Sequence, residues 1–287
     1  MKLSNALHEF LLEQKIRGNS IQTYETYEKR VGYFIEFITD KEVDQLTLQD
    51  YIDYVLYLQS KNLSSQTIKT RLNDVRVFIR FLHRRKYIYS DFDLPTYKAG
   101  KKTIVILTEN EIDRLLHYFN RGTLLGSRDY LIAILMLDCG LRVSEVLRLE
   151  VGDFIINNSV IKILGKGAKE RLVPLTTSVV EALNHYMILS GIETGKLFNI
   201  TTSGVRIAFS KIKKNLHFSR FHPHYLRHTF ATWFIINGGD ALNLKEILGH
   251  ETLYMTEVYV HIANQMTIAR QSIYSPLTVL QSKRKKA

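Results

Sequence analysis

The stretch FHPHYLRH, residues 221–228, places a proline where a helix is expected to start, with a histidine and an arginine close behind it. Proline is favoured in the first turn of a helix, where the backbone N–H groups have no partner within the helix. His224 and Arg227 are three residues apart, so they are expected on one helix face. Free N–H groups, an imidazole and a guanidinium together favour an anion, and the stretch predicts a phosphate-binding site.

A metal site is the alternative interpretation of the same stretch, because it contains His222, His224 and His228. No acidic or cysteine ligand accompanies these histidines, and their spacing is not a recognised zinc spacing. The sequence therefore favours the phosphate, and no metal is expected.

Three further motifs carry residues suited to phosphate chemistry. Arg142 lies in GLRVSE, residues 140–145, and Lys166 lies in GKGAKE, residues 165–170. His250 ends the tripeptide LGH, and Tyr259 follows nine residues later. The lysine motif lacks the glycine spacing and the following Ser or Thr of a Walker loop, so ATP use is not expected and no cofactor is predicted.

In chain order, these motifs resemble the tyrosine recombinase (phage integrase) family, in particular its compact Xer-type and transposon-encoded members. The resemblance covers nearly all of the family's catalytic half and includes the nine-residue step from His250 to Tyr259. It implies an enzyme that cuts and rejoins DNA in site-specific recombination or integration. The catalytic residues that it implies are Arg142, Lys166, His224, Arg227, His250 and Tyr259.

The chemistry of phosphate transfer explains the positively charged members of this set. A phosphodiester under attack gathers negative charge on its non-bridging oxygens, and two guanidiniums with a histidine can stabilise that charge without a metal. Arg142, Arg227 and His250 are assigned this role. Glu145 follows Arg142 by three residues and is predicted to orient an active-site arginine from behind, although a surface ion pair is the alternative.

Tyr259 is the implied nucleophile. A phenol has a pKa near 10, so it needs a proton acceptor, and the family suggests His224 for this role. Lys166, on a hairpin turn, is the implied general acid that protonates the departing sugar oxygen. By resemblance, Tyr259 forms a 3′-phosphotyrosyl link and releases a 5′-hydroxyl. The neighbours expected to anchor its helix are Val258, Val260 and Ile262.

The first hundred residues are expected to form helices, because apolar residues recur at three- and four-residue intervals. Helix starts are predicted at Ser20, after Thr47 and after Ser64-Ser65. The apolar positions expected in the first three helices are Leu7, Phe10 and Leu11, then Ile21, Tyr24, Tyr27, Val31, Phe34, Ile35 and Ile38, then Tyr51, Ile52, Val55, Leu56 and Leu58. Those expected in the fourth are Ile68, Leu72, Val75, Ile79 and Leu82.

The other side of the fourth helix carries Lys69, Arg76 and Arg80, separated by seven and four residues. At 3.6 residues per turn these cations form one stripe, which is named the basic stripe below. A solvated face is the plain interpretation. Because Asp74 alone interrupts the positive charge between Lys61 and Lys86, the basic stripe is predicted to bind DNA phosphates.

Residues 91–103 contain Pro95 and Gly100 and show no apolar period, which predicts a linker between two domains. Residues 1–98 hold 15 Lys and Arg against 13 Asp and Glu, and the remainder holds 24 against 15. The second part therefore carries most of the positive surplus. The first part looks like the family's core-binding domain. The resemblance therefore implies a helical core-binding (SAM-like) domain at 1–92, a linker at 93–103, a catalytic domain at 104–274 and a C-terminal tail at 275–287.

The second domain is predicted to be mostly helical with a small β-hairpin sheet. Thr108 and Glu111 fit a capping box at a helix start. Val160–Leu164 and Arg171–Leu175 are short aliphatic runs joined by a glycine-containing turn, as in a hairpin. The fold class is thus mainly α with a small β-hairpin sheet. The resemblance implies that the two domains form a clamp on duplex DNA. The resemblance also suggests that the C-terminal tail packs on a neighbouring protomer.

The formal charge of +11 favours a polyanionic partner, and double-stranded DNA is expected. No apolar run is long enough to span a membrane, and the N-terminus lacks a secretory signal, so a cytoplasmic protein is predicted. The single cysteine, Cys139, is expected to be a buried core thiol. Because the core-binding pattern starts close to Met1, no additional N-terminal domain for remote DNA sites is expected.

The family resemblance implies a homo-tetramer, or an assembly with related recombinase protomers, on two DNA sites. Two alternatives stay open at this point. A type IB topoisomerase shares the chemistry but relaxes a single duplex. A DNA-binding regulatory protein could keep the fold with a degenerate site.

Overall fold

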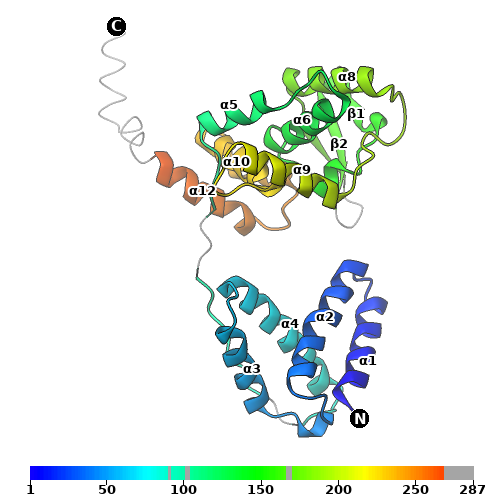
Figure 1. Ribbon diagram of the computed structural model, residues 1–287, viewed down its shortest axis with the longest axis vertical. Helices are drawn as coiled ribbons and strands as arrows, with labels where there is room; N and C mark the ends of the chain where they lie inside the picture. The colour runs from blue at the N-terminus through cyan, green and yellow to red at the C-terminus, as the bar shows by residue number, and fades with distance from the viewer. Residues whose placement is uncertain (90–91, 101–103, 166–169, 268–287) are drawn as a thin grey trace. The chain divides into compact units, whose positions relative to one another are not determined.

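A computed structural model describes residues 1–89, 92–100, 104–165 and 170–267. The chain divides into two compact units, Met1–Lys102 and Thr103–Ala287 (Figure 1). Each unit has its own apolar core. Mostly helical structure with one small sheet confirms the predicted fold class. Within the described ranges, no helix combines the length and the apolar composition that crossing a membrane would require.

The helices of the first unit begin at polar caps. Ser20 and Ser64 accept hydrogen bonds from the backbone N–H groups three residues on, and Thr47 forms a capping box with Asp50. The predicted helix starts are thereby confirmed to within a residue. The elements are α1 (Leu3–Ile16), α2 (Ile21–Phe37), η1 (Val43–Gln45), α3 (Leu48–Ser60) and α4 (Ser65–Arg84).

The core of this unit is rich in aromatic residues. The five apolar positions predicted for α4 are all buried, which confirms its apolar face. Two predicted core positions are wrong, since Ile21 and Leu56 are exposed, whereas Tyr54 is fully buried. Ile21 lies in the first turn of α2, where the chain enters from solvent, and Leu56 lies on the side of α3 that faces water.

The chain segment that follows α4 packs back on the same unit. Leu94 is buried in the core, and the Tyr51 hydroxyl donates a hydrogen bond to the carbonyl of Pro95 at 3.3 Å. Arg76 of α4 donates from Nη1 to Oγ1 of Thr96 at 2.8 Å. Part of the segment predicted as linker is thus held by α3 and α4.

The second unit surrounds a three-stranded antiparallel sheet of order β1-β2-β3, in which Ile161 pairs with Val173. The predicted hairpin is confirmed, with a short first strand added at its edge. Its strands are β1 (Phe154–Ile155), β2 (Val160–Leu164) and β3 (Glu170–Pro174). Its helices are α5 (Glu109–Tyr118), α6 (Leu124–Leu137), α7 (Val143–Val146), η2 (Val151–Asp153), η3 (Ile156–Asn158), α8 (Thr177–Ser190), α9 (Thr202–Asn215), α10 (Pro223–Ile236), α11 (Ala241–Leu248) and α12 (Tyr254–Thr267).

Helices α6 and α10 lie at the centre of this unit (Figure 1). The apolar run of α6 is buried from Leu131 to Met136, and Cys139 behind it is a buried thiol, as predicted. Gly140 has a φ of +66°, and a Cβ there would lie 2.4 Å from the ring of Phe230 on α10. A residue with a Cβ would be strained at this φ and would collide with Phe230. Glycine at position 140 therefore lets the α6–α7 turn pack directly against α10.

Candidate active site

The predicted catalytic residues lie on four separate elements of the second unit. Arg142 is the N-cap residue of α7, Arg227 lies on α10, His250 follows α11 and Tyr259 lies on α12. The last three elements pack on one another. Lys166 lies outside the described residues, between β2 and β3.

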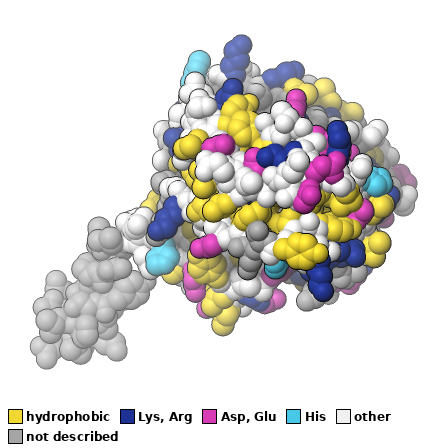
Figure 2. Space-filling model, turned by 90° about the horizontal axis from the view of Figure 1, so that it is seen from below, with side chains coloured by type: hydrophobic (Ala, Val, Ile, Leu, Met, Phe, Trp, Pro, Cys, Tyr) yellow, Lys and Arg dark blue, Asp and Glu magenta, His cyan; other side chains and the backbone are white. Residues whose placement is uncertain are grey.

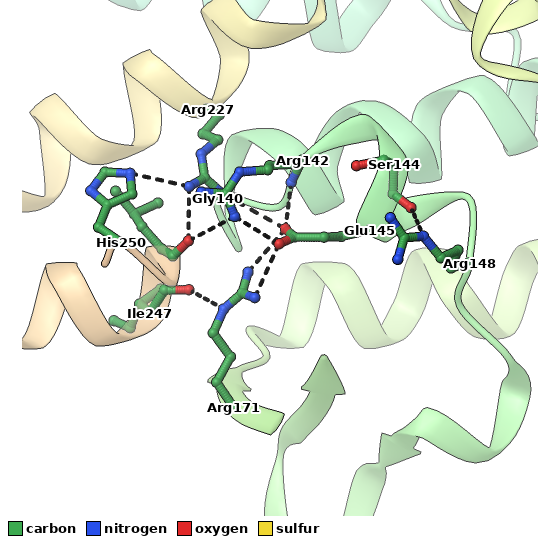
Figure 3. A network of polar contacts seen from close by, with 10 residues as sticks. Gly140, Arg142, Ser144, Glu145, Arg148, Arg171, Arg227, Ile247 and His250 are labelled. Atoms are coloured by element: carbon green, nitrogen blue, oxygen red, sulfur yellow. Dashed lines mark hydrogen bonds and ion pairs between the residues drawn. The ribbon is translucent and has the colours of Figure 1, made fainter. Parts of the chain in front are cut away.

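Glu145 is the centre of a buried ion-pair network (Figure 3). Its Oε2 accepts from the Arg142 backbone N–H at 2.8 Å, and its Oε1 accepts from Arg142 Nη1 at 2.9 Å. Arg227 Nη1 stands 3.7 Å from Oε2. Burial by itself raises the pKa of Glu145, but the hydrogen bonds and charges of its arginine partners outweigh burial and lower it. The carboxylate is therefore ionised at neutral pH.

Arg171 is the member of this network that the sequence analysis missed. From β3 it makes two hydrogen bonds to Glu145, at 3.1 and 2.9 Å, and donates from Nε to the carbonyl of Ile247 at 2.8 Å. Its guanidinium also lies against Gly249, the left-handed residue that ends α11. Arg171 thus joins the β2–β3 hairpin to α7 and to the turn that precedes His250. The only sequence signal is an arginine in the first positions of a predicted strand.

Arg227 is fixed by carbonyl groups from two other elements. It is 4% exposed and donates to the carbonyl of Gly140 at 2.6 Å and to that of Leu248 at 2.8 Å. Burial, together with the positive charge of Arg142, lowers the pKa of Arg227 to about 10. The guanidinium is still charged at neutral pH. The network therefore joins three guanidiniums to one carboxylate, which leaves a positive surplus suited to an anion.

His250 is held between Arg227 and the helix that carries Tyr259. Arg227 Nη2 lies 3.3 Å from Nε2 of His250, and Nδ1 lies 2.9 Å from Oγ1 of Thr256. Since a guanidinium only donates, Nε2 is the acceptor, and Nδ1 carries the proton that it donates to Thr256. Burial and the charges of Arg227 and Arg142 lower the pKa of His250 to about 4. The imidazole is thus neutral in the free protein.

Tyr259 is 4% exposed and points its phenol toward α10. The buried face of α12 is formed by Thr256, Tyr259 and Ala263, which follow helical spacing. The predicted anchors are wrong in part, because Val258 is exposed, and Val260 and Ile262 are only partly buried. Burial raises the pKa of Tyr259, although the charges of Arg227 and Arg142 oppose this rise.

The phenol of Tyr259 lies 2.9 Å from Nδ1 of His228, a residue to which the sequence analysis gave no catalytic role. His224, the acceptor that the family suggests, is exposed on the preceding turn of α10, whereas Arg227 is buried. The rings of His224 and His228 are 6.5 Å apart. In the described part of the chain, no three His, Cys, Asp or Glu side chains form a cluster that could hold a metal ion.

The basic stripe lies on α4 of the first unit. Arg80 is exposed, whereas Lys69 and Arg76 are partly buried. Arg76 and Arg80 line a hollow of about 460 Å³. Residues 92–94, which belong to the segment after α4, line the same hollow. The face seen in Figure 2 carries acidic, basic and apolar side chains intermixed, so the positive surplus is not gathered there.

Comparison with known families identifies both units. Residues 106–266 match the phage integrase family, and residues 7–89 match the N-terminal SAM-like domain of phage integrases. The chain belongs to the phage integrase family, which confirms the resemblance seen in its motifs.

Its relatives include Xer recombinases over nearly their full length. The chain is 29% identical to tyrosine recombinase XerD of Oceanobacillus iheyensis, over 96% of this chain and 99% of the relative. It is 31% identical to tyrosine recombinase XerC of Halalkalibacterium halodurans, over 88% of this chain and 91% of the relative. The chain is thus a tyrosine recombinase similar to the Xer proteins.

Solved structures share the fold. A Tn1549 transposon integrase in complex with transposon right end DNA has a TM-score of 0.73 at 20% identity, covering 95% of this chain and 100% of that one. A lambda integrase dimer bound to a core site has a TM-score of 0.75 at 17% identity, and the match covers 90% of this chain and 95% of that one.

Proposed function

We propose that this protein is a site-specific DNA recombinase whose Tyr259 attacks a backbone phosphate and whose arginines bind that phosphate. The observation that carries the proposal is a buried tyrosine phenol beside a network of three guanidiniums around one carboxylate. A phosphodiester supplies the negative charge that this network lacks. Charge that develops during attack is then stabilised by groups already held in place.

Arg142 and Arg227 are the guanidiniums that contact the non-bridging oxygens in this proposal. Glu145 holds Arg142 from behind, and Arg227 is held by two carbonyl groups, so neither needs to reorganise on binding. An anionic phosphate beside His250 raises the low pKa of that imidazole, because it offsets the neighbouring positive charges. Nε2 can then be protonated and donate to the same phosphate.

Lys166 is the proposed general acid. Attack by Tyr259 forms a 3′-phosphotyrosyl link, and the departing 5′ oxygen takes a proton from Lys166. The covalent link conserves the energy of the phosphodiester bond. A 5′-hydroxyl from a second duplex can therefore reverse the attack and join the strands without ATP.

Lys166→Ala is expected to cleave an ordinary phosphodiester about 100-fold or more slowly than the parent, which is the usual contribution of a general acid. On a substrate whose 5′-bridging oxygen is sulfur, the variant should recover, because a thiolate leaves without a proton. Single-turnover cleavage on both substrates measures the recovery. Arg227→Ala is the comparison and should show no selective rescue. If the sulfur substrate rescues both variants equally, Lys166 is not the general acid.

Duplex DNA is the proposed partner. The Tn1549 and lambda integrases, which have the same fold, were solved bound to DNA. The net charge of +11 and the basic stripe support the same partner. We further propose assembly of four protomers on two DNA sites, since strand exchange needs two duplexes, and a location in the cytoplasm.

Replacement of Lys69, Arg76 and Arg80 together by Ala is expected to weaken binding to DNA of any sequence. Each phosphate contact contributes about 0.9 to the slope of log affinity against log salt, so the slope should fall by up to about 2.7. A salt titration by fluorescence anisotropy measures this slope.

The control removes equal charge elsewhere in the first unit, by replacing the exposed residues Lys2, Lys15 and Lys61 with Ala. It should lower the slope less than the stripe variant does. If both triple variants give the same slope, the basic stripe is a solvated face and not a DNA contact.

A trapping experiment tests the function as a whole. The protein is incubated with nicked suicide duplexes in excess EDTA and without nucleotide, and denaturing gels separate DNA that is covalently bound to protein. Sequencing the trapped DNA identifies the target site. Two duplexes that carry this site should then exchange strands. Relaxation of supercoiled DNA without joint products would instead indicate a topoisomerase, and binding without any adduct would indicate a regulatory protein.

A further inference from the structure

A histidine and the proposed nucleophile meet where α10 and α12 pack together. Nδ1 of His228 lies 2.9 Å from Oη of Tyr259, and the two ring centroids are 5.7 Å apart. The residues are 31 positions apart in the chain, so the contact is a product of the tertiary fold. A general base must lie within about 2.6 to 3.2 Å of the proton that it takes, and His228 meets this condition.

The phenol needs such an acceptor. Tyr259 is buried, and burial raises the pKa of its phenol despite the neighbouring charges of Arg227 and Arg142. Tyr259 therefore carries its proton at neutral pH, and this proton must leave when Oη bonds to phosphorus. An imidazole can take up such a proton on one ring nitrogen while the other nitrogen carries a hydrogen.

The other histidine on this face of α10 lies in a more exposed position. His224 lies one turn before His228 and is exposed, and its ring centroid is 6.5 Å from that of His228. Its position at the helix start suits contact with the incoming DNA, whereas His228 lies beside the phenol itself.

We propose that His228 is a catalytic residue that accepts the proton of Tyr259 during strand cleavage and returns it during rejoining. In cleavage, the Oη–H bond breaks and the proton moves to Nδ1, while Oη bonds to phosphorus. The bond from phosphorus to the 5′ oxygen breaks, and that oxygen takes its proton from the general acid. Rejoining reverses each transfer. The inference rests on the proposed function and adds the proton acceptor to it.

His228→Asn is the central test, because its side-chain oxygen can accept a hydrogen bond near the position of Nδ1 but is not basic enough to take a proton. The matched variant is His224→Asn on the same helix face. Single-turnover formation of the covalent adduct is followed on suicide substrates with either oxygen or sulfur at the 5′-bridging position. Circular dichroism and DNA binding show that each variant is folded.

His228→Asn should form the adduct about 100-fold or more slowly than the parent on both substrates, with unchanged DNA affinity. Sulfur should not rescue it, because sulfur removes the need for a general acid and leaves the need for a base. His224→Asn should slow adduct formation less than His228→Asn does. Added imidazole should partly restore His228→Ala, a second variant that opens space beside the phenol.

An adduct rate in His228→Asn close to that of the parent would overturn the inference. So would rescue by sulfur, which would place His228 at the leaving group, or a larger loss in His224→Asn. These results would leave the proposed function intact. A parent protein that forms no adduct would overturn the proposed function, and this inference with it.

Discussion

Tyr259→Phe is expected to form no covalent adduct with DNA while it folds and binds DNA like the parent. The substitution removes Oη, the atom that attacks phosphorus in the proposed mechanism, and keeps the ring. That ring stacks on the imidazole of His250, with centroids 6.2 Å apart, and it lies on the buried face of α12 beside Ala263. Packing is therefore preserved. Denaturing gels of protein trapped on a nicked suicide substrate measure the adduct.

Tyr254→Phe is the matched control for this experiment. Tyr254 begins the same helix, five residues before Tyr259, but its side chain is 81% exposed. Loss of its hydroxyl should leave adduct formation close to that of the parent. If a folded, DNA-binding Tyr259→Phe protein still forms the adduct, Tyr259 is not the nucleophile.

Glu145→Gln is expected to destabilise the second unit by about 3 to 5 kcal/mol, the usual cost of breaking a buried ion pair by removal of one partner. The amide keeps the shape of the side chain but leaves Arg142, Arg171 and Arg227 without their shared negative charge. Adduct formation should fall as well, because Arg142 loses the group that orients it. The single tryptophan, Trp233, lies on α10, so its fluorescence during urea denaturation reports on this unit.

Glu246→Gln is the control for the charge change alone. Glu246 lies on α11 and pairs with its neighbour Lys245 in an exposed position, so its loss should not shift the urea midpoint measurably. Equal midpoints for Glu145→Gln, Glu246→Gln and the parent would show that the buried network contributes nothing to stability.

The sequence by itself determined the features that depend on local chemistry. A serine or threonine caps the backbone N–H groups three residues away, so Ser20, Thr47 and Thr108 marked helix starts without knowledge of the rest of the fold. Apolar residues at three- and four-residue intervals predicted the buried face of α4. Short aliphatic runs on either side of a glycine-containing turn predicted the strands of the hairpin. The chain order of the motifs predicted the family and pointed to Arg142, Arg227, His250 and Tyr259.

The tertiary structure alone decided which side chains meet. Arg171 contacts Glu145 across 26 residues and Ile247 across 76, and no periodicity or cap encodes such pairs. In the same way, helical spacing put His224 and His228 on one face, but only the packing of α12 on α10 placed the Tyr259 phenol beside His228. The energy of a buried charge and the transfer of a buried proton depend on all the groups around them. Those groups come from elements that only folding brings together.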